Sequence, residues 1–453
     1  MLPTIATGNV ASALAGEYEV ANSLRFNDDS NDYLTRTFSA GNRKTWSFST
    51  WIKRCNLTNV NMNILGTDYT GMGEAYLLFR PGEQLMYGQY ESGGTANNFS
   101  FQTNQAFRDI SAWYNILFVW DTTQSTSSDR MKLYVNGTQV TSFSSSTYPS
   151  LNLDGVWNSG RVHYIGDATY GANLDGYLCE TVFVDGTALS PTDVGEFDSD
   201  TNIWKPIDVS GLTFGTNGFY LDFENSGSLG ADVSGNGNNF TVNNLTSIDQ
   251  TTDTCTNNFA TMNSLIPSNI TYSNGNNTIV YGTDYHATFG TLGFTQGKWY
   301  YETKIENVSI VTDQYIGIAG ETAIVTGATY DATPSVFYSG DGSIYVDGTA
   351  TQSSLTSFSG GTILGVAINM DSSQIDFYID GVKQGTTETI PSNSGFYLPY
   401  VGGANPRSCS FNFGNPPFTI TSGNSDGNNR GNFEYPVPSG YYALNTKNLA
   451  EYG

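Results

Sequence analysis

The chain has 453 residues, and 42 acidic residues against 18 basic ones give it a formal net charge of −24 at pH 7. Phosphate contacts need clustered Lys and Arg, so this charge predicts no nucleic-acid binding, and it also disfavours an anionic membrane surface. The length favours two or three domains, 38% hydrophobic residues allow them a core, and no run approaches the roughly 18 apolar residues of a membrane-spanning helix, so we expect no membrane insertion.

Residues 1–20 come before the first strand-like pattern. They carry no charge until Glu17, and Gly8-Asn9 interrupts their apolar run. Because no Lys or Arg precedes Arg25, the segment lacks the charged start of a secretory signal peptide. We expect it to form an N-terminal arm outside the folded domains.

Residues 21–206 have the pattern of antiparallel strands. The stretch "WSFSTWIKR" (46–54) alternates along its length, and "WYNILFVWD" (113–121) is apolar on both faces, as a central strand is. In "KLYVNGTQV" (132–140) an Asn-Gly pair breaks the alternation, which predicts a type I′ hairpin turn. Three similar phrases with Asp-Gly predict further hairpins: "VFVDGTALS" (182–190), "IYVDGTATQ" (344–352) and "DFYIDGVKQ" (376–384).

The order of these motifs carries a resemblance. A Trp-rich strand, a Trp-Tyr strand, a long polar loop, "LYVNG" and then "IGDATYGANLDGYL" follow one another in an order similar to that of laminin-G-like domains. The resemblance implies a concanavalin A-like jelly roll over residues 21–206.

The composition changes at residues 207–255, which are richer in Gly, Asn, Ser and Thr and which we interpret as a connector with little β structure. A second set of strand patterns follows over 256–420. Its "GKWYYETKIENV", its "GVAINMDSSQIDFYIDG" and its closing "FNFGNPPF" together resemble a SPRY domain. Residues 421–453 remain as a C-terminal segment. We therefore expect an all-β chain of two concanavalin A-like, jelly-roll antiparallel β-sandwiches in tandem, laminin-G-like plus SPRY, without a strong helix.

Concanavalin A-like folds include glycoside hydrolases, which use a pair of carboxylates as catalytic groups, so we looked for such a pair in the sequence. The stretch "GEFDSDT" places Glu196, Asp198 and Asp200 two residues apart, about 6.6 Å between neighbours on a strand, but it lacks the rest of a glucanase motif. Neither His163 nor His286 has a recognisable Ser or Cys partner. We therefore expect no catalytic residues and no enzyme.

Calcium is the one cofactor that the sequence raises. The stretch "DVSGNGNNF" begins like a calcium loop at Asp232, but its twelfth position is Asn243 rather than Glu, which excludes an EF-hand. Laminin-G-like domains often carry calcium at the rim of a sheet, and Asp167 and Asp175 flank a loop where oxygen ligands could gather. These two are the candidate metal ligands, with hydrated turn aspartates as the alternative. The four cysteines lie far apart, which favours reduced thiols over a zinc site.

Tyrosine is the remaining signal, with 29 residues. A tyrosine offers a flat apolar ring with a hydroxyl at its tip, which suits both sugars and protein interfaces. Many must be ordinary strand residues. The loop residues Tyr69, Tyr170 and Tyr330 are the candidate ligand contacts, although each also fits an incidental loop residue.

From end to end the chain resembles a virion surface protein of tailed bacteriophages. The resemblance rests on "LRFNDDSNDYLTRTFSAGNRKTWSFSTWIKR" near the start, on the order of the two domains and on the ending "YYALNTKNL". It implies a tail-fibre or appendage adhesin that binds the host surface, a glycan above all, through loops of its sandwiches. A capsid decoration or head-fibre protein is the alternative, and a polysaccharide depolymerase is a third.

The same resemblance implies partners and a location. The partners would be other virion proteins, in the tail or the capsid, and a glycan or receptor of the host. The chain would form a homo-oligomer, a trimer if it is a tail fibre, and residues 1–20 would attach it to the particle. It would be assembled in the bacterial cytoplasm and displayed on the virion surface.

Overall fold

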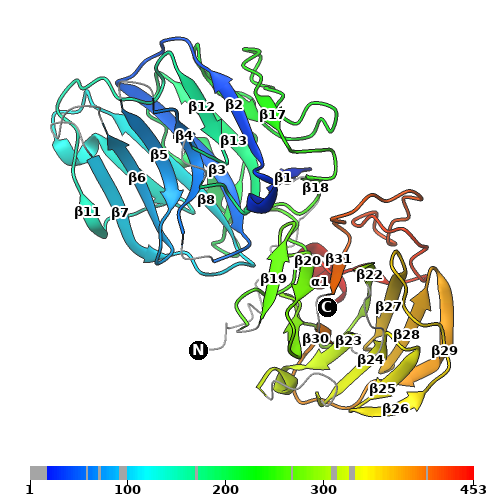
Figure 1. The fold of residues 1–453 in the computed structure, drawn as a ribbon. Helices are drawn as coiled ribbons and strands as arrows, with labels where there is room; N and C mark the ends of the chain where they lie inside the picture. The colour runs from blue at the N-terminus through cyan, green and yellow to red at the C-terminus, as the bar shows by residue number, and fades with distance from the viewer. Residues whose placement is uncertain are drawn as a thin grey trace. The chain divides into compact units, whose positions relative to one another are not determined.

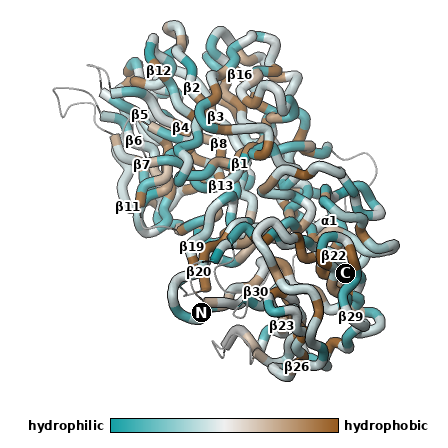
Figure 2. Tube along the Cα trace, turned by 45° about the vertical axis from the view of Figure 1, so that its right-hand side comes forward, coloured by the Kyte–Doolittle hydropathy of each residue, from teal (hydrophilic) through white to brown (hydrophobic). Residues whose placement is uncertain are grey.

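The structure is a computed structural model in which two compact units cover residues 15–256 and 257–453. Regular structure is almost entirely β strand, with hydrophobic residues (brown) along strands such as those around β3 and β22 (Figure 2). This confirms the predicted all-β fold. No helix in the described part of the chain is long and apolar enough to cross a membrane. The described residues are 18–57, 60–69, 73–90, 99–168, 172–266, 269–307, 314–325, 332–404 and 407–453.

The first unit contains two eight-stranded antiparallel sheets, which we call the back sheet and the front sheet (Figure 1). The back sheet consists, in spatial order, of β10 (Thr138–Gln139), β9 (Met131–Val135), β8 (Trp113–Asp121), β3 (Thr45–Arg54), β13 (Gly176–Asp185), β1 (Ser23–Phe26) and β18 (Gln250–Thr251), with β16 (Phe219–Leu221) also beside β13. The front sheet consists of β11 (Phe143–Ser146), β7 (Phe99–Ala106), β6 (Gln84–Tyr90), β5 (Glu74–Phe79), β4 (Met62–Thr67), β12 (Val162–Ile165), β2 (Tyr33–Thr37) and β17 (Thr241–Asn243). A separate two-stranded sheet pairs β14 (Gly195–Phe197) with β15 (Trp204–Pro206).

The core of the first unit is aromatic and lies between these sheets. Alternating side chains of a strand point to opposite faces, so Trp46 and Phe48 of β3 both point inward. Trp46 stacks on Trp120 of β8 with ring centroids 6.1 Å apart, and both rings are fully buried. Each large apolar side chain buried in this way contributes roughly 1.5–3 kcal/mol. This core fixes the register of the strands and therefore decides which residues reach the outer faces.

Three of the four predicted hairpins are present. Asn136, Asp347 and Asp380 have φ values of 47°, 48° and 48°, and each is followed by a glycine with positive φ, as a type I′ turn requires. The fourth prediction is wrong, because β13 ends at Asp185 and the chain continues into a short 3-10 turn. The Asp185 carboxylate instead accepts a hydrogen bond from the backbone N–H of Asn217 at 3.1 Å.

The structure also corrects the interpretation of residues 207–255 as a connector. Within this segment β16 pairs with β13, β17 with β2 and β18 with β1. The segment therefore adds two strands to the back sheet and one to the front sheet. Phe219 and Leu221 are fully buried in the core. The first unit therefore runs to residue 256. Gly- and Asn-rich turns between three very short strands concealed this role in the sequence.

The second unit also contains two sheets, antiparallel except where β32 pairs in parallel with β22. The larger has β19 (Ile270–Ser273), β20 (Thr278–Tyr281), β31 (Ser408–Asn412), β22 (Lys298–Asn307), β27 (Ile363–Asn369), β28 (Gln374–Ile379) and β29 (Val382–Thr389), with β32 (Tyr442–Ala443) also beside β22. The smaller has β21 (His286–Phe289), β30 (Tyr397–Gly403), β23 (Gln314–Gly320), β24 (Ser335–Ser339), β25 (Ser343–Val346) and β26 (Thr349–Gln352). A second aromatic and aliphatic core, separate from the first, lies between them.

Residues 421–453, predicted as a separate segment, are integral to the second unit. Glu302, the glutamate of the "GKWYYE" stretch, is fully buried on β22. Its carboxylate accepts hydrogen bonds from the backbone N–H groups of Glu434 at 2.9 Å and Tyr435 at 2.8 Å. Burial raises the pKa of Glu302, although these donors oppose the shift. The carboxylate therefore fastens the C-terminal segment to the sheet.

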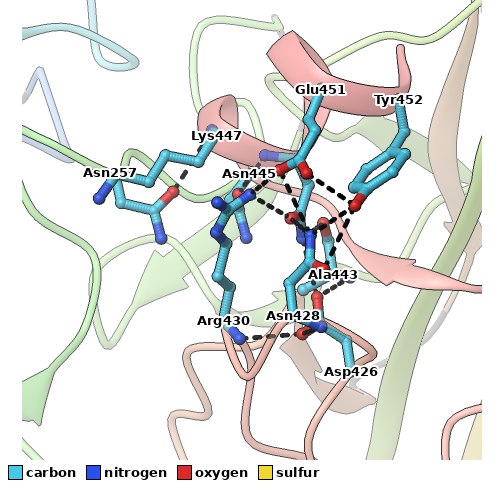
Figure 3. Close-up of polar contacts among 10 residues, drawn as sticks. Asn257, Asp426, Asn428, Arg430, Ala443, Asn445, Lys447, Glu451 and Tyr452 are labelled. Carbon is cyan, nitrogen blue, oxygen red and sulfur yellow. Dashed lines mark hydrogen bonds and ion pairs between the residues drawn. The ribbon is translucent and has the colours of Figure 1, made fainter. Parts of the chain in front are cut away.

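The segment ends in a helix, α1 (Thr446–Tyr452), that the sequence did not predict (Figure 3). The Asn445 side chain caps it by accepting a hydrogen bond from the backbone N–H of Asn448 at 2.9 Å. The buried Asp426 carboxylate accepts a hydrogen bond from the Asn448 side chain at 2.8 Å. Arg430 pairs with Glu451 at 2.8 Å (Figure 3). Because these side chains hydrogen-bond mainly to one another and to the backbone, we interpret the cluster as a structural anchor.

Candidate functional site

A row of tyrosines and glycines crosses the outer face of the front sheet. Tyr164 of β12 lies opposite Gly66 of β4, Gly66 lies opposite Tyr76 of β5, and Tyr76 lies opposite Gly88 of β6. The residues next to them in each strand point into the core, so the row itself must face outward. Those inward neighbours are Ile165, Leu65, Leu77 and Tyr87.

The two glycines allow close approach to the sheet surface. A Cβ atom on Gly88 would lie 2.4 Å from Cε2 of Tyr76, so the Tyr76 ring lies across the backbone of β6. A Cβ atom on Gly66 would lie 2.7 Å from the Cβ of Ala168 and 2.8 Å from the carbonyl oxygen of Asp167. The Asp167–Ala168 segment therefore lies directly over β4, between the two tyrosines of the row.

Two more tyrosines extend the row on either side. The Tyr33 and Tyr164 rings have centroids 6.0 Å apart, and the Tyr76 and Tyr90 rings have centroids 5.9 Å apart. All four rings are partly exposed. Burial raises the pKa of Tyr76 and of Tyr164, and nearby acidic groups raise both further, so their hydroxyls stay protonated at neutral pH. We call Tyr33, Tyr76, Tyr90 and Tyr164 the tyrosine face.

Of the two predicted metal ligands, Asp167 lies beside this face, whereas Asp175 directly precedes β13 of the back sheet. Asp167 and Asp175 are both buried, and burial raises the pKa of each carboxyl. Within the described residues, both carboxylate oxygens of Asp175 and Oδ1 of Asp167 have no hydrogen-bond partner. Oδ1 atoms of Asn27 and Asn63 are buried without partners as well. Such orphaned oxygens suit either a cation or a protonated carboxyl.

No group of three His, Cys, Asp or Glu side chains in the described part of the chain is placed to hold a metal ion. Amide and backbone oxygens would therefore have to complete a calcium site, as they do in many proteins. Calcium at Asp167 and Asp175 stays a prediction.

Of the three tyrosines predicted as ligand contacts, only Tyr69 lies in the described part of the chain. Tyr69 follows β4 and is 46% exposed. Tyr170 and Tyr330 lie outside the described residues. The tyrosine face was missed because its members stand in strands, where a tyrosine is ordinary. A usable signal was present: Tyr76 and Tyr164 occupy outward positions of their strands, and Gly66 and Gly88 occupy outward positions of β4 and β6.

The stretch "GEFDSDT" does not form a catalytic pair. Glu196 is exposed, and hydrogen bonds from the backbone and hydroxyl of Thr201 lower the pKa of Asp198 to about 2. Asp198 also pairs with Lys205 at 3.3 Å. A general acid would need a raised pKa, so this carboxylate instead stabilises its own turn.

His163 and Asp232 also have structural surroundings. His163 is fully buried and stacks on Phe38 at 3.9 Å, and burial lowers the pKa of its imidazole to about 3. Asp232 accepts hydrogen bonds from the backbone N–H groups of Ser234 at 2.9 Å and Asn238 at 2.7 Å. The loop that resembled a calcium loop is thus closed by its own aspartate.

One buried carboxyl has an unusual environment on the back sheet. Glu180 interrupts β13 with a φ of 50°, and its side chain accepts hydrogen bonds from the hydroxyls of Tyr220 at 2.9 Å and Tyr18 at 3.0 Å. Burial raises its pKa to about 7. Tyr18 is the first described residue of the chain and lies within the predicted arm, so Glu180 holds the point where the arm joins the domain.

Comparisons with known proteins identify both domains. Residues 28–195 match the family model of the concanavalin A-like lectin/glucanases superfamily, and residues 298–416 match that of the SPRY domain. The SPRY domain of human HERC1 is 18% identical, with 30% of this chain and 87% of that chain covered and a TM-score of 0.26. A heptameric SAP-like pentraxin from Limulus polyphemus is 14% identical, with 38% and 80% covered and a TM-score of 0.27. None of the curated proteins matches the chain. The chain thus carries a concanavalin A-like domain followed by a SPRY domain.

Proposed function

We propose that this tandem of a concanavalin A-like domain and a SPRY domain is a binding protein of a bacteriophage virion surface, and that its tyrosine face binds a host glycan. The observation that carries the glycan-binding part is the row from Tyr164 to Gly88 across the front sheet. It presents two aromatic rings about two strand spacings apart on a rigid sheet, and strands stand roughly 4.8 Å apart.

The chemistry of the face suits a neutral sugar. The flat face of a tyrosine ring packs against the C–H groups of a pyranose, and the hydroxyl at its tip hydrogen-bonds to sugar hydroxyls. The half-buried rings of Tyr76 and Tyr164 are held by neighbouring rings, so little side-chain freedom is lost on binding. The Asp167–Ala168 segment fills the space over Gly66 between the two rings.

The virion setting is supported by the sequence resemblance and by charge. A net charge of −24 suits a displayed, soluble surface rather than a nucleic-acid partner. We propose other virion proteins as structural partners, a homo-oligomer as the working form and residues 1–20 as the attachment arm. Tail-fibre display is the first choice, and capsid decoration, with a stabilising or weakly adhesive role, is the second.

We propose binding without catalysis. Glu180 and Glu302, two carboxyls whose pKa is raised, are buried and engaged in structural hydrogen bonds. Release of reducing ends from a host polysaccharide by the purified chain would contradict this and favour a depolymerase.

The experiment is binding of the purified full-length chain to immobilised glycans and to a panel of bacteria. Stacking and neutral hydrogen bonds depend weakly on salt, so binding should change little between about 50 mM and about 500 mM NaCl, or strengthen as repulsion is screened. A steep loss with salt would point to ion pairing by the few Lys and Arg. Absence of glycan and cell binding in a folded sample would overturn the adhesin role and favour decoration.

A further inference from the structure

Two cysteines far apart in the sequence meet at the back of the first domain. The Sγ atoms of Cys179 and Cys255 lie 3.7 Å apart, although the residues are 76 positions apart in the chain. Both are free thiols in the structure. A disulfide requires about 2.05 Å between sulfurs, so the two sulfurs would have to move about 1.6 Å closer to bond.

Both backbones are held in place around the pair. Cys179 lies on β13, opposite Trp51 of β3. On either side of Cys255, Thr256 accepts a hydrogen bond from the backbone N–H of Val20 at 3.1 Å, and the Asp253 side chain pairs with Lys53 at 2.8 Å. The approach of the two sulfurs is therefore fixed by the fold.

We propose that Cys179 and Cys255 are a latent disulfide, made as thiols in a reducing cytoplasm and closed by exchange with a small-molecule disulfide such as oxidised glutathione. Cys255 is partly exposed and Cys179 fully buried, so Cys255 reacts first. Its thiolate attacks one sulfur of glutathione disulfide and releases one glutathione thiolate. The Cys179 thiolate then attacks the Cys255 sulfur of the mixed disulfide and releases the second. The balance is one dithiol and one glutathione disulfide giving one protein disulfide and two glutathiones.

The bond would fasten the end of the first domain. Cys255 stands one residue before the last residue of the first unit, and Cys179 stands next to Glu180, which holds Tyr18. Closure would thus tie β13 to the stretch through which the chain leaves the domain. Disulfides persist outside cells and are rare in cytosol, so this lock would operate after release. It does not depend on what the tyrosine face binds.

The other two cysteines provide the matched comparison. Cys409 lies in the second unit and is fully buried. Cys55 directly follows β3 and is also buried. Cys179, by comparison, is buried with its sulfur in contact with that of Cys255. Burial and the neighbouring Cys179 sulfur raise the pKa of the Cys255 thiol, so closure should accelerate with rising pH.

The test is oxidation of the full-length chain with glutathione disulfide at a series of pH values from about 8 to about 10, followed by intact mass and peptide mapping. We expect a loss of about 2 Da, a Cys179–Cys255 crosslinked peptide, reversal by dithiothreitol and a rise of about 5–10 °C in the melting temperature of the first domain. The variant Cys409→Ser should still close, and Cys255→Ser should not.

Three results would overturn the proposal. One is a stable glutathione adduct on Cys255 with Cys179 still a free thiol. Another is a crosslink that maps to Cys55 or Cys409. The third is a wild-type chain that stays unmodified after prolonged oxidation at every pH up to about 10, because rising pH ionises a growing fraction of a thiol even when its pKa is raised. Because all three are read on the wild-type chain, the test holds even if a variant fails to fold.

Discussion

The two domains each carry a row of aromatic residues and glycine across the outer face of a sheet, and the rows have different surroundings. In the first domain the row of Tyr164, Gly66, Tyr76 and Gly88 keeps both rings partly exposed. In the second domain the row on the smaller sheet is packed with Ala323 and Ala332 and is buried except at Tyr345, which is partly exposed. That row consists of Phe289, Tyr400, Gly317, Phe337 and Tyr345.

The pattern alone therefore does not mark a binding surface. In the second domain Phe337 and Tyr400 are fully buried, and their rings lie 6.2 Å apart, so this row is a second small core. In the first domain the tyrosine rings pack against one another in pairs, but each ring stays partly exposed. Exposure, not aromatic content, separates a candidate site from a core.

The largest expected difference is in stability. Phe337→Ala should destabilise the second domain by about 3–5 kcal/mol, because it leaves a cavity in a fully buried cluster. Tyr76→Ala should cost the first domain only about 1 kcal/mol, because its ring is partly exposed. Calorimetry of the full chain measures both. Equal losses of stability in the two variants would contradict the view that one row is a buried core and the other an exposed face.

A second contrast concerns two buried glutamates. Glu302 accepts hydrogen bonds from backbone N–H groups as well as from the Tyr300 hydroxyl, whereas Glu180 accepts from two tyrosine hydroxyls and its pKa is raised to about 7 from 4.5. A raised folded-state pKa gives stability that is fully present below pH 4.5 and is lost as the pH rises through about 7.

Lowering the pH from about 8 to about 5 should therefore stabilise the wild-type first domain relative to Glu180→Gln by about 2–3 kcal/mol. His163, whose pKa is lowered to about 3, titrates in the opposite sense, but equally in both proteins. Denaturant unfolding at several pH values gives the difference. A pH-independent difference would mean that Glu180 stays ionised in the fold.

The calcium prediction gives a smaller effect that is confined to the first domain. If Ca²⁺ occupies the orphaned oxygens of Asp175, a concentration of about a hundred times the dissociation constant should stabilise the domain by about 2.7 kcal/mol. Asp175→Asn should weaken this response, while the second domain stays unchanged in both proteins. If Ca²⁺ does not change the melting temperature of the wild-type protein, Asp175 is a protonated carboxyl rather than a calcium ligand.

The fold was largely predictable, because hairpin phrases and strand alternation are local signals. The Asn136-Gly137 pair forms a hairpin turn, as predicted. The similar pair Asp185-Gly186 lies at the end of a strand and forms no hairpin. The connector interpretation failed because strands as short as Phe219–Leu221 carry too little pattern to stand out among Gly and Asn.

The candidate site was hidden for a different reason. Tyr33, Tyr76, Tyr90 and Tyr164 come together only through the order β6-β5-β4-β12-β2, which places β12 between strands from much earlier in the chain. Sequence reasoning finds outward positions within one strand, but it does not give the neighbours of that strand. The loop tyrosines drew attention because loops often carry function, and of these only Tyr69 lies in the described part of the chain.

Glycan affinity of matched tyrosine variants is the most direct test of binding at the tyrosine face. Tyr76→Ala/Tyr164→Ala removes both rings of the row, and Tyr285→Ala removes a tyrosine of the second domain that is 50% exposed. With about 1–2 kcal/mol for each stacking ring, the double variant should bind the glycan at least about 30-fold more weakly, and the control should bind like the wild type. Unchanged affinity in a folded double variant would contradict glycan binding by this face.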